Sequence, residues 1–233
     1  MQTIINSMIQ LNQSQAKLLS LPYLLIVKTL ADAITEDNEL SLVDIRKLAE
    51  ETGNITLRAQ SIMAMLELNV FFQKWEEAAF LLTEAGDLGS VLMGFFAMTR
   101  FTYLEGLISS KAAQAASTWM NKRKWKKKAL KAAKLIEKWV KLGNGNVLHS
   151  LHLLQAECAA LTGKHKATEV SFKAAIKVAS RNGFLHDLAL SHEMASAYYL
   201  GKGDDYWQDY HMGRCIESYS EYGATAKVKQ LNK

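Results

Sequence analysis

The sequence has few of the residues that interrupt helices and few that form cross-links. Its 233 residues include one proline, 13 glycines and two cysteines. Because proline and glycine are the strongest helix breakers, long helices can follow one another with few interruptions. No stretch alternates apolar and polar residues between turn dipeptides, as half-buried strands do. We therefore predict an all-α fold.

Other absences bear on the cellular compartment. Cys158 and Cys215 have no paired-ligand spacing, and so low a count is typical of a reducing compartment. The apolar run at residues 18–31 is broken by polar side chains and by Pro22, so it is too short to span a bilayer. Residues 1–15 lack the basic and apolar regions of a signal peptide. We expect a cytoplasmic protein.

The sequence pattern of one helical hairpin occurs twice between residues 147 and 223. Gly163 and Gly203 are 40 residues apart, and so are Gly183 and Gly223. The apolar positions repeat at the same interval: Phe172 with Met212, Ala175 with Cys215, and Ile176 with Ile216. A fixed period of this size is typical of helical repeat arrays, in which each unit buries its apolar face against the next.

The doubled hairpin resembles a tetratricopeptide unit. In that family a small residue on the first helix lets the second helix approach, and Ala156 and Ser196 occupy this position. The second helix of the family unit carries a large and a small residue three positions apart, and here these are Phe172 with Ala175 and Met212 with Cys215. The resemblance implies a tetratricopeptide-like α-solenoid of antiparallel helix pairs, with a concave groove suited to peptides or helices.

Two features depart from the family pattern. His152 and His192 stand where the family has an early tryptophan, and we expect them to pack at equivalent places in successive repeats. The period of about 40 also exceeds the usual value of about 34 residues, so longer helices are expected.

The rest of the chain is also predicted to be helical. Ser41 and Asp44 have the spacing of a capping box, and Thr56 is expected to cap the following helix. Helices are predicted at residues 1–19, 20–35, 41–53, 56–71, 76–85, 91–117, 119–142 and 224–231, with core aromatic residues at Phe95, Phe96, Phe101 and Tyr103. We divide the chain into an irregular N-terminal part of the array, 1–55, and helical repeats with a C-terminal capping helix, 56–233.

A strongly basic segment precedes the doubled hairpin. Between Lys122 and Lys141 there are ten basic side chains and one acid, Glu137. Trp125 and Ala129 are among the apolar residues that share one side of a helical wheel, so the segment is predicted to be an amphipathic helix with a positive outer face. That face is interpreted as a solvated surface, a docking face for an acidic protein, or a site for nucleic acid or anionic membrane.

The C-terminal third carries a more specific resemblance. The segments HDLALSHEMA at 186–195, AYYL at 197–200 and GATAKVKQL at 223–231 are similar to one known region. It is the tetratricopeptide-like region that follows the AAA-type ATPase domain in large signalling proteins with serine/threonine kinase, GAF and sensor histidine kinase domains. The resemblance covers residues 57–231. It implies a helical scaffold in signal transduction, with kinase or ATPase signalling modules as possible partners.

The sequence predicts no catalytic, cofactor-binding or metal-binding site. It contains neither a phosphate-binding Gly-x-x-x-x-Gly-Lys-[Ser/Thr] loop nor kinase motifs. His149, His152 and Cys158 do not have zinc-site spacing, and His192-Glu193 lacks the second histidine of a zincin. A nucleophilic Cys158 or Cys215 would need an activating histidine. We therefore assign no catalytic, cofactor-binding or metal-binding residue.

The function expected from the sequence is non-catalytic. The chain is interpreted as a helical-repeat scaffold that mediates protein–protein interaction in signalling, without a cofactor or a small-molecule substrate. One alternative is an inactive fragment or degenerate copy of an ATPase-linked kinase. The other is a basic adaptor that binds nucleic acid or anionic membrane through Lys122–Lys141.

Overall fold

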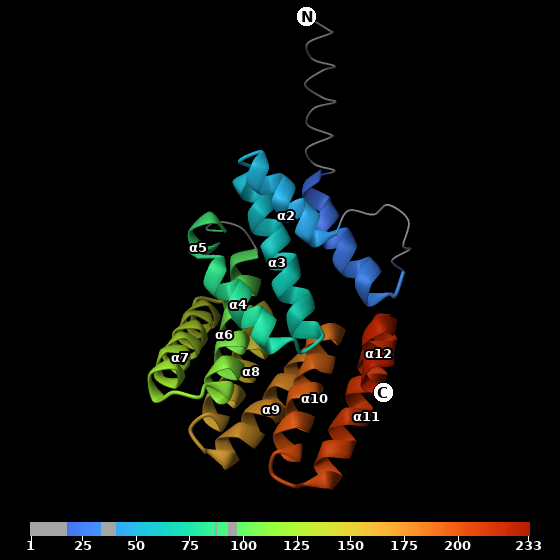
Figure 1. Cartoon of the computed structure of the whole chain (residues 1–233). Coiled ribbons are helices and arrows are strands. Elements are labelled where there is room, and N and C mark those ends of the chain that lie inside the picture. The colour runs from blue at the N-terminus through green and yellow to red at the C-terminus, as the bar shows by residue number, and fades with distance from the viewer. Residues whose placement is uncertain (1–17, 34–40, 87, 93–96) are drawn as a thin grey trace, which may run out of the picture.

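A computed structural model describes residues 18–33, 41–86, 88–92 and 97–233, and every regular element in these ranges is a helix (Figure 1). A first helix covers residues 18–30. The elements that follow are α2 (Leu42–Glu51), α3 (Ile55–Phe71), α4 (Trp75–Glu84), α5 (Leu88–Val91), α6 (Ala97–Ala115), α7 (Trp119–Lys141), the 3-10 turn η1 (Gly145–Val147), α8 (Leu148–Ala160), α9 (His165–Arg181), α10 (Leu185–Leu200), α11 (Asp205–Tyr222) and α12 (Thr225–Leu231). The all-α prediction is confirmed for this part of the chain.

Several predicted boundaries can be compared with these elements. Residues 1–17 of the first expected helix lie outside the described residues, as do Phe95 and Phe96. The helix expected to start at residue 20 already covers residue 18, so Pro22 lies within it. The helix expected at 91–117 is confirmed at residues 97–115, which form α6. Leu92 lies in a turn after α5, which contradicts the expected start, and residues 93–96 lie outside the described residues.

Short polar side chains start two of the helices. The Ser41 hydroxyl accepts a hydrogen bond from the Asp44 amide, and the Asp44 carboxylate accepts one from the Ser41 amide at 3.0 Å, which confirms the capping box. The prediction that Thr56 caps α3 is wrong. Asn54 takes that role, since its Oδ1 accepts a hydrogen bond from the Leu57 amide at 3.0 Å.

Many of the helices are followed by a residue with a left-handed backbone conformation. The glycines of the doubled hairpin have φ values of 67° at Gly163, 73° at Gly183, 70° at Gly203 and 84° at Gly223. Glycine adopts this conformation without the steric cost that a Cβ atom brings. Gln73 takes the equivalent place after α3 with a φ of 55°, although its side chain gives no hint of a turn.

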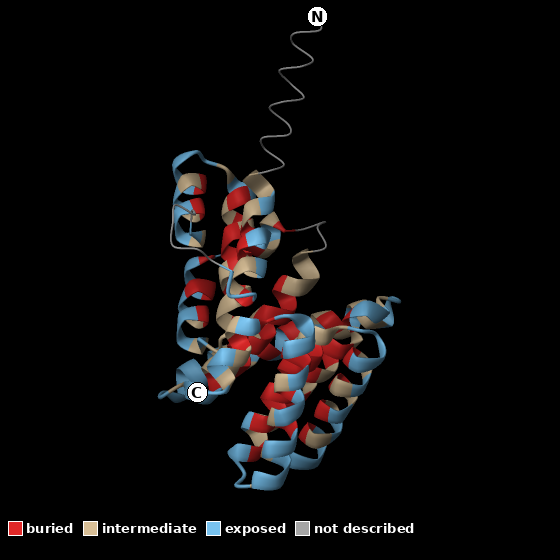
Figure 2. Cartoon of the chain, turned by 90° about the vertical axis from the view of Figure 1, so that its right-hand side faces the viewer, coloured by how far each residue is buried: buried red, intermediate tan, exposed pale blue. Residues whose placement is uncertain are grey.

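Consecutive helices pack in pairs. α2 pairs with α3, α6 with α7, α8 with α9, and α10 with α11, while α4 contacts both α3 and α6. α6 also contacts α8, and α8 contacts α10. Figure 2 shows that the buried residues gather where the helices face one another and that the exposed residues cover the outside. One apolar cluster extends through these pairs and includes Leu66, Leu104, Leu154, Phe172 and Leu190.

The α6–α8 contact depends on a glycine. A Cβ atom at Gly106 would lie 2.7 Å from Cδ2 of Leu154 and 3.1 Å from Cβ of Ala132. Gly106 therefore allows a close approach similar to that expected of Ala156 and Ser196, which are both buried. The 40-residue repeat did not predict this role for Gly106, because Gly106 lies 50 residues before Ala156 rather than 40.

The first and last described helices touch each other. Leu30 and Phe71 belong to the same buried cluster as Tyr219 and Ala224, and Lys229 of α12 pairs with the carboxylate of Asp32. α12 also packs on α11. The C-terminal helix therefore connects the last hairpin to the segment that contains Leu30 and Asp32.

Candidate functional site: a basic helix face and a buried charge cluster

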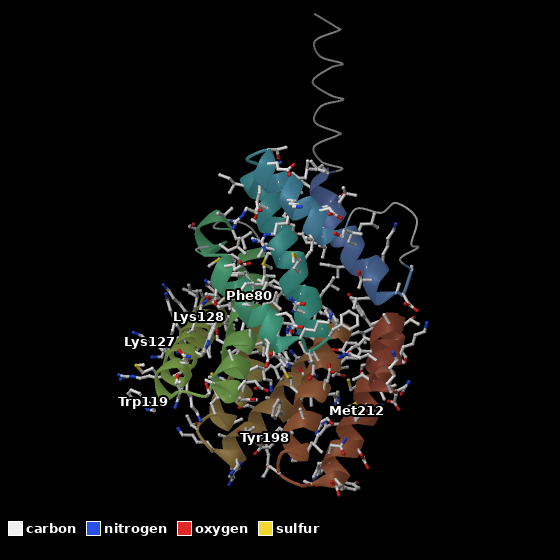
Figure 3. The ribbon with its side chains drawn as sticks, viewed as in Figure 1. Phe80, Trp119, Lys127, Lys128, Tyr198 and Met212 are labelled. Atoms are coloured by element: carbon white, nitrogen blue, oxygen red, sulfur yellow. The ribbon has the colours of Figure 1, made fainter. Side chains whose placement is uncertain are left out.

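α7 is amphipathic, as the sequence predicted. Ala129, Ala132 and Ile136 are buried, and Trp125 packs against the main core from a half-buried position. In Figure 3, Trp119 and Lys127 lie at the outer edge of the molecule on α7, away from the core. The Thr118 hydroxyl caps the helix by accepting a hydrogen bond from the Asn121 amide.

Most basic side chains of α7 form no ion pair within the part of the chain that the structure describes. Of its ten basic side chains, Lys128 pairs with Glu105 at 3.2 Å and Lys141 with Glu137 at 2.7 Å. The other eight form no ion pair with a described residue. An α7 basic face, defined as these eight side chains (Lys122, Arg123, Lys124, Lys126, Lys127, Lys131, Lys134 and Lys138), is therefore available to an outside partner.

Large apolar side chains lie next to this charge. Trp119 is 69% exposed and Met120 is 73% exposed, at the start of α7. The guanidinium of Arg123 lies 5.3 Å from the centre of the Trp119 ring, within cation–π range. The start of the α7 basic face thus offers both apolar contact and charge.

A second group of charges is buried between helices far apart in the sequence. Arg100 of α6 binds Glu67 of α3 through Nε at 3.0 Å and Asp187 of α10 through Nη1 at 2.7 Å. The Asp187 side chain is only 4% exposed. Sequence reasoning missed this cluster because its members are 33 and 87 residues apart and no local pattern marks them.

Two histidines complete the cluster around Asp187. The Oδ2 atom of Asp187 lies 2.8 Å from Nε2 of His149 and 3.2 Å from Nε2 of His186. Burial alone would raise the pKa of Asp187, but Arg100 and the two imidazoles more than offset it and hold that pKa well below its usual range. Asp187 is therefore an ionised anchor for three side chains.

Two cavities adjoin the charge cluster, and Arg100 and His186 line both. The larger has a volume of about 580 Å³ and mostly apolar walls, among them Met63, Phe71 and Leu92. The smaller, which we call the helix-start cavity, has a volume of about 340 Å³. Its walls are the first residues of α6, α8 and α10 with the segments just before α8 and α10.

The candidate metal and nucleophile residues do not converge. His152 is half-buried and its Nδ1 bonds to Gln155 of its own helix at 3.2 Å, whereas His149 bonds to Asp187 of α10. Burial and the neighbouring Glu157 raise the pKa of Cys158 to about 11, and burial also raises that of Cys215. Among the residues that the structure describes, no group of three histidine, cysteine or acidic side chains is placed to hold a metal ion.

His192 and Glu193 each have a buried partner. His192 is buried and its Nδ1 lies 2.9 Å from Nδ1 of His211, whereas His152 is half-buried and bonds to Gln155. Glu193 pairs with Lys227 at 2.6 Å, and both side chains are at most 3% exposed. Burial raises the pKa of Glu193, while Lys227 acts in the opposite direction. These pairs join α10 to α11 and α12.

Comparisons with protein-family models, curated proteins and solved structures give no match. In the described part of the chain, no helix combines the length and the apolar character that crossing a membrane requires.

Proposed function

We propose that this chain is a non-catalytic helical-repeat scaffold and that it binds an acidic segment of a protein partner on the α7 basic face. The observation that carries the proposal is a set of eight cations on one helix that form no ion pair with any described residue, beside exposed Trp119 and Met120.

The helix pairs support a repeat scaffold. Among the described helices, the pairs α6–α7, α8–α9 and α10–α11 follow one another directly, and their first helices touch from α6 to α10. We infer that they form a tetratricopeptide-like solenoid with a repeat of about 40 residues at its C-terminal end. Such scaffolds act by shape and surface charge. The family resemblance of residues 186–231 makes signal transduction the expected setting, with kinase or ATPase modules as candidate partners.

An acidic protein segment suits α7 better than nucleic acid does. The chain carries a net charge of only +5, which is small for a protein that binds phosphate backbones along its length. The basic residues follow a single helix of 23 residues, about 35 Å long at 1.5 Å per residue. Exposed Trp119 and Met120 add an apolar contact at one end, which an amphipathic acidic helix could cover.

The test uses a fluorescent amphipathic peptide rich in glutamate and leucine, with a glutamine-for-glutamate peptide as its uncharged control. A variant with Lys124, Lys127 and Lys131 replaced by glutamine should bind the acidic peptide about tenfold more weakly at low salt, since each exposed ion pair contributes roughly 0.5 kcal/mol. The matched control variant replaces three exposed lysines of the α9 region, Lys164, Lys166 and Lys177.

The control variant should bind like the parent chain, and binding should weaken as salt screens the charges. Equal losses in the two triple variants would show that only net charge matters, which contradicts the proposal. Tighter binding of duplex DNA or of phosphatidylserine vesicles through the same three lysines would instead support a basic adaptor.

A further inference from the structure

An exposed row of tyrosines and acids runs along the first half of α11, which lies at an edge of the molecule in Figure 1. Tyr206 is 74% exposed and Tyr210 is 48% exposed, and their spacing of four residues places them on one side of the helix. Asp205 and Asp209 occupy the adjacent row, and both are exposed. Neither carboxylate forms an ion pair with a described residue. We call these four side chains the α11 face.

Trp207 contacts both tyrosine rings of the α11 face. Its ring centre lies 5.4 Å from that of Tyr206 and 5.5 Å from that of Tyr210, at interplanar angles of 81° and 85°. Trp207 in turn stacks on the buried Tyr199 of α10, with the ring centres 6.1 Å apart. The tyrosines are therefore held against the packed part of the molecule, and side chains that are already held lose less conformational entropy when a partner binds.

The doubled hairpin shows that its fold does not need these aromatic residues. At the start of α9, forty residues earlier, Lys166 and Val170 take the places of Tyr206 and Tyr210. Both are exposed, and α9 packs on α8 as α11 packs on α10. The packing of the hairpin therefore does not explain the two tyrosines.

Gly213 continues the α11 face along the helix. It lies three residues after Tyr210, and the equivalent place in α9 is Lys173. Glycine is unfavourable inside a helix, and a Cβ atom at Gly213 would meet nothing within 4 Å, so packing against the described residues does not require it. An exposed glycine leaves room for the backbone of a partner to approach.

The charge of this region is opposite to that of the whole chain. Between Lys202 and Glu221 there are five acidic side chains and two basic ones, although the chain carries a net charge of +5. Both basic side chains are already paired, Lys202 with Glu169 at 3.3 Å and Arg214 with Glu217. A positively charged partner is therefore complementary to this region.

The tyrosine rings also favour a cation, because the face of an aromatic ring carries partial negative charge. Nζ of Lys173 lies 6.0 Å from the ring centre of Trp207, whereas no described cation lies over either tyrosine of the α11 face. Arginine suits such rings better than lysine, since its guanidinium is planar and more weakly hydrated. We propose that the α11 face binds an arginine-rich segment of a protein partner, whose guanidinium groups stack on the tyrosines and pair with Asp205 and Asp209.

Three peptides of one sequence separate charge from stacking. The first has two arginines four residues apart, the second has lysine in their places, and the third has citrulline, the uncharged analogue of arginine. In NMR titrations of the chain, the arginine peptide is expected to shift the amide resonance of Gly213 and to leave that of Gly53, before α3, unchanged. The lysine peptide should bind about twofold more weakly and the citrulline peptide at least about fivefold more weakly.

Substitutions of exposed residues supply the second readout. Tyr206→Ala should weaken binding of the arginine peptide about threefold, which corresponds to one cation–π contact at an exposed site. Its matched control is Phe80→Ala, since Phe80 is 66% exposed on α4. Asp209→Asn should weaken binding about twofold at low salt, because it removes one exposed ion pair. Its control is Glu77→Gln, at an exposed acid of α4.

The proposal is overturned if the arginine peptide leaves the Gly213 resonance unchanged, or if the citrulline peptide binds as tightly. It is also overturned if Tyr206→Ala and Asp209→Asn bind the arginine peptide like their controls. Self-association of the chain that Asp209→Asn abolishes would assign the α11 face to a second copy, which likewise overturns it. The variant with three lysines of α7 replaced by glutamine should bind the arginine peptide like the parent chain, so this proposal and the one for α7 fail separately.

Discussion

The buried pair of His192 and His211 predicts a loss of stability in mild acid. Their Nδ1 atoms are 2.9 Å apart, so one imidazole must donate and the other must accept. Protonating both would place two N–H groups and two positive charges against each other, with Arg214 and Lys173 adding to the repulsion. His192 is only 4% exposed, so water cannot stabilise the added charge.

The size of the effect follows from the pKa of His192. Burial, followed by the charges of His211 and Arg214, lowers this pKa from 6.5 to about 3. Below pH 6.5 the unfolded chain therefore binds a proton that the folded chain does not, so the free energy of unfolding decreases as the pH falls from 6.5 toward 3. At pH 5 the difference is 1.5 pH units, or about 2 kcal/mol at 1.36 kcal/mol per unit. Above pH 6.5 this contribution is constant.

Urea unfolding at about pH 7.5 and pH 5.0 measures this difference. The parent chain should lose about 2 kcal/mol more between the two conditions than His192→Gln, whose neutral amide does not titrate. His152→Gln is the matched control, since His152 lies 40 residues earlier and is only half-buried. It should lose as much as the parent chain. Equal losses in the parent chain and in His192→Gln would refute the argument.

Three further sets of substitutions test the packing, all by urea unfolding at neutral pH. Gly203→Ala should destabilise the fold by about 1 kcal/mol, because Gly203 has a φ of 70° that a residue with a Cβ atom adopts only with strain. Gly213 lies inside α11 with open space around it, so Gly213→Ala should stabilise the fold by about 0.5–1 kcal/mol. A loss of similar size at both glycines would contradict the assignment of strain to φ. Gly106→Ala should cost about 1–3 kcal/mol because its Cβ atom would overlap Leu154. In the double variant with Leu154→Ala, the total loss should be smaller than the sum of the two single losses, because the overlap is removed. Lys227→Met should cost about 3 kcal/mol, since it leaves the buried carboxylate of α10 without its cation, and a loss below about 1 kcal/mol would show that water reaches that carboxylate.

The features predicted correctly are local ones. Ser41 and Asp44 are three residues apart, and their capping box depends only on the chain between them. The amphipathic pattern of α7 and the glycine turns after the repeated helices depend on intervals of a few residues. Gln73 shows the limit of such signals, because it adopts a left-handed φ where the pattern calls for glycine.

The sequence by itself determined that this chain is helical, where its doubled hairpin turns and which face of α7 is basic, because caps, turns and helical periodicity act over a few residues. Only the tertiary structure decided that Arg100 would join Glu67 to Asp187, and that His149 and Tyr103 would line one cavity. Those contacts depend on the angles and offsets at which the helix pairs stack. The packing of many side chains sets these angles together, so no short stretch of sequence encodes them.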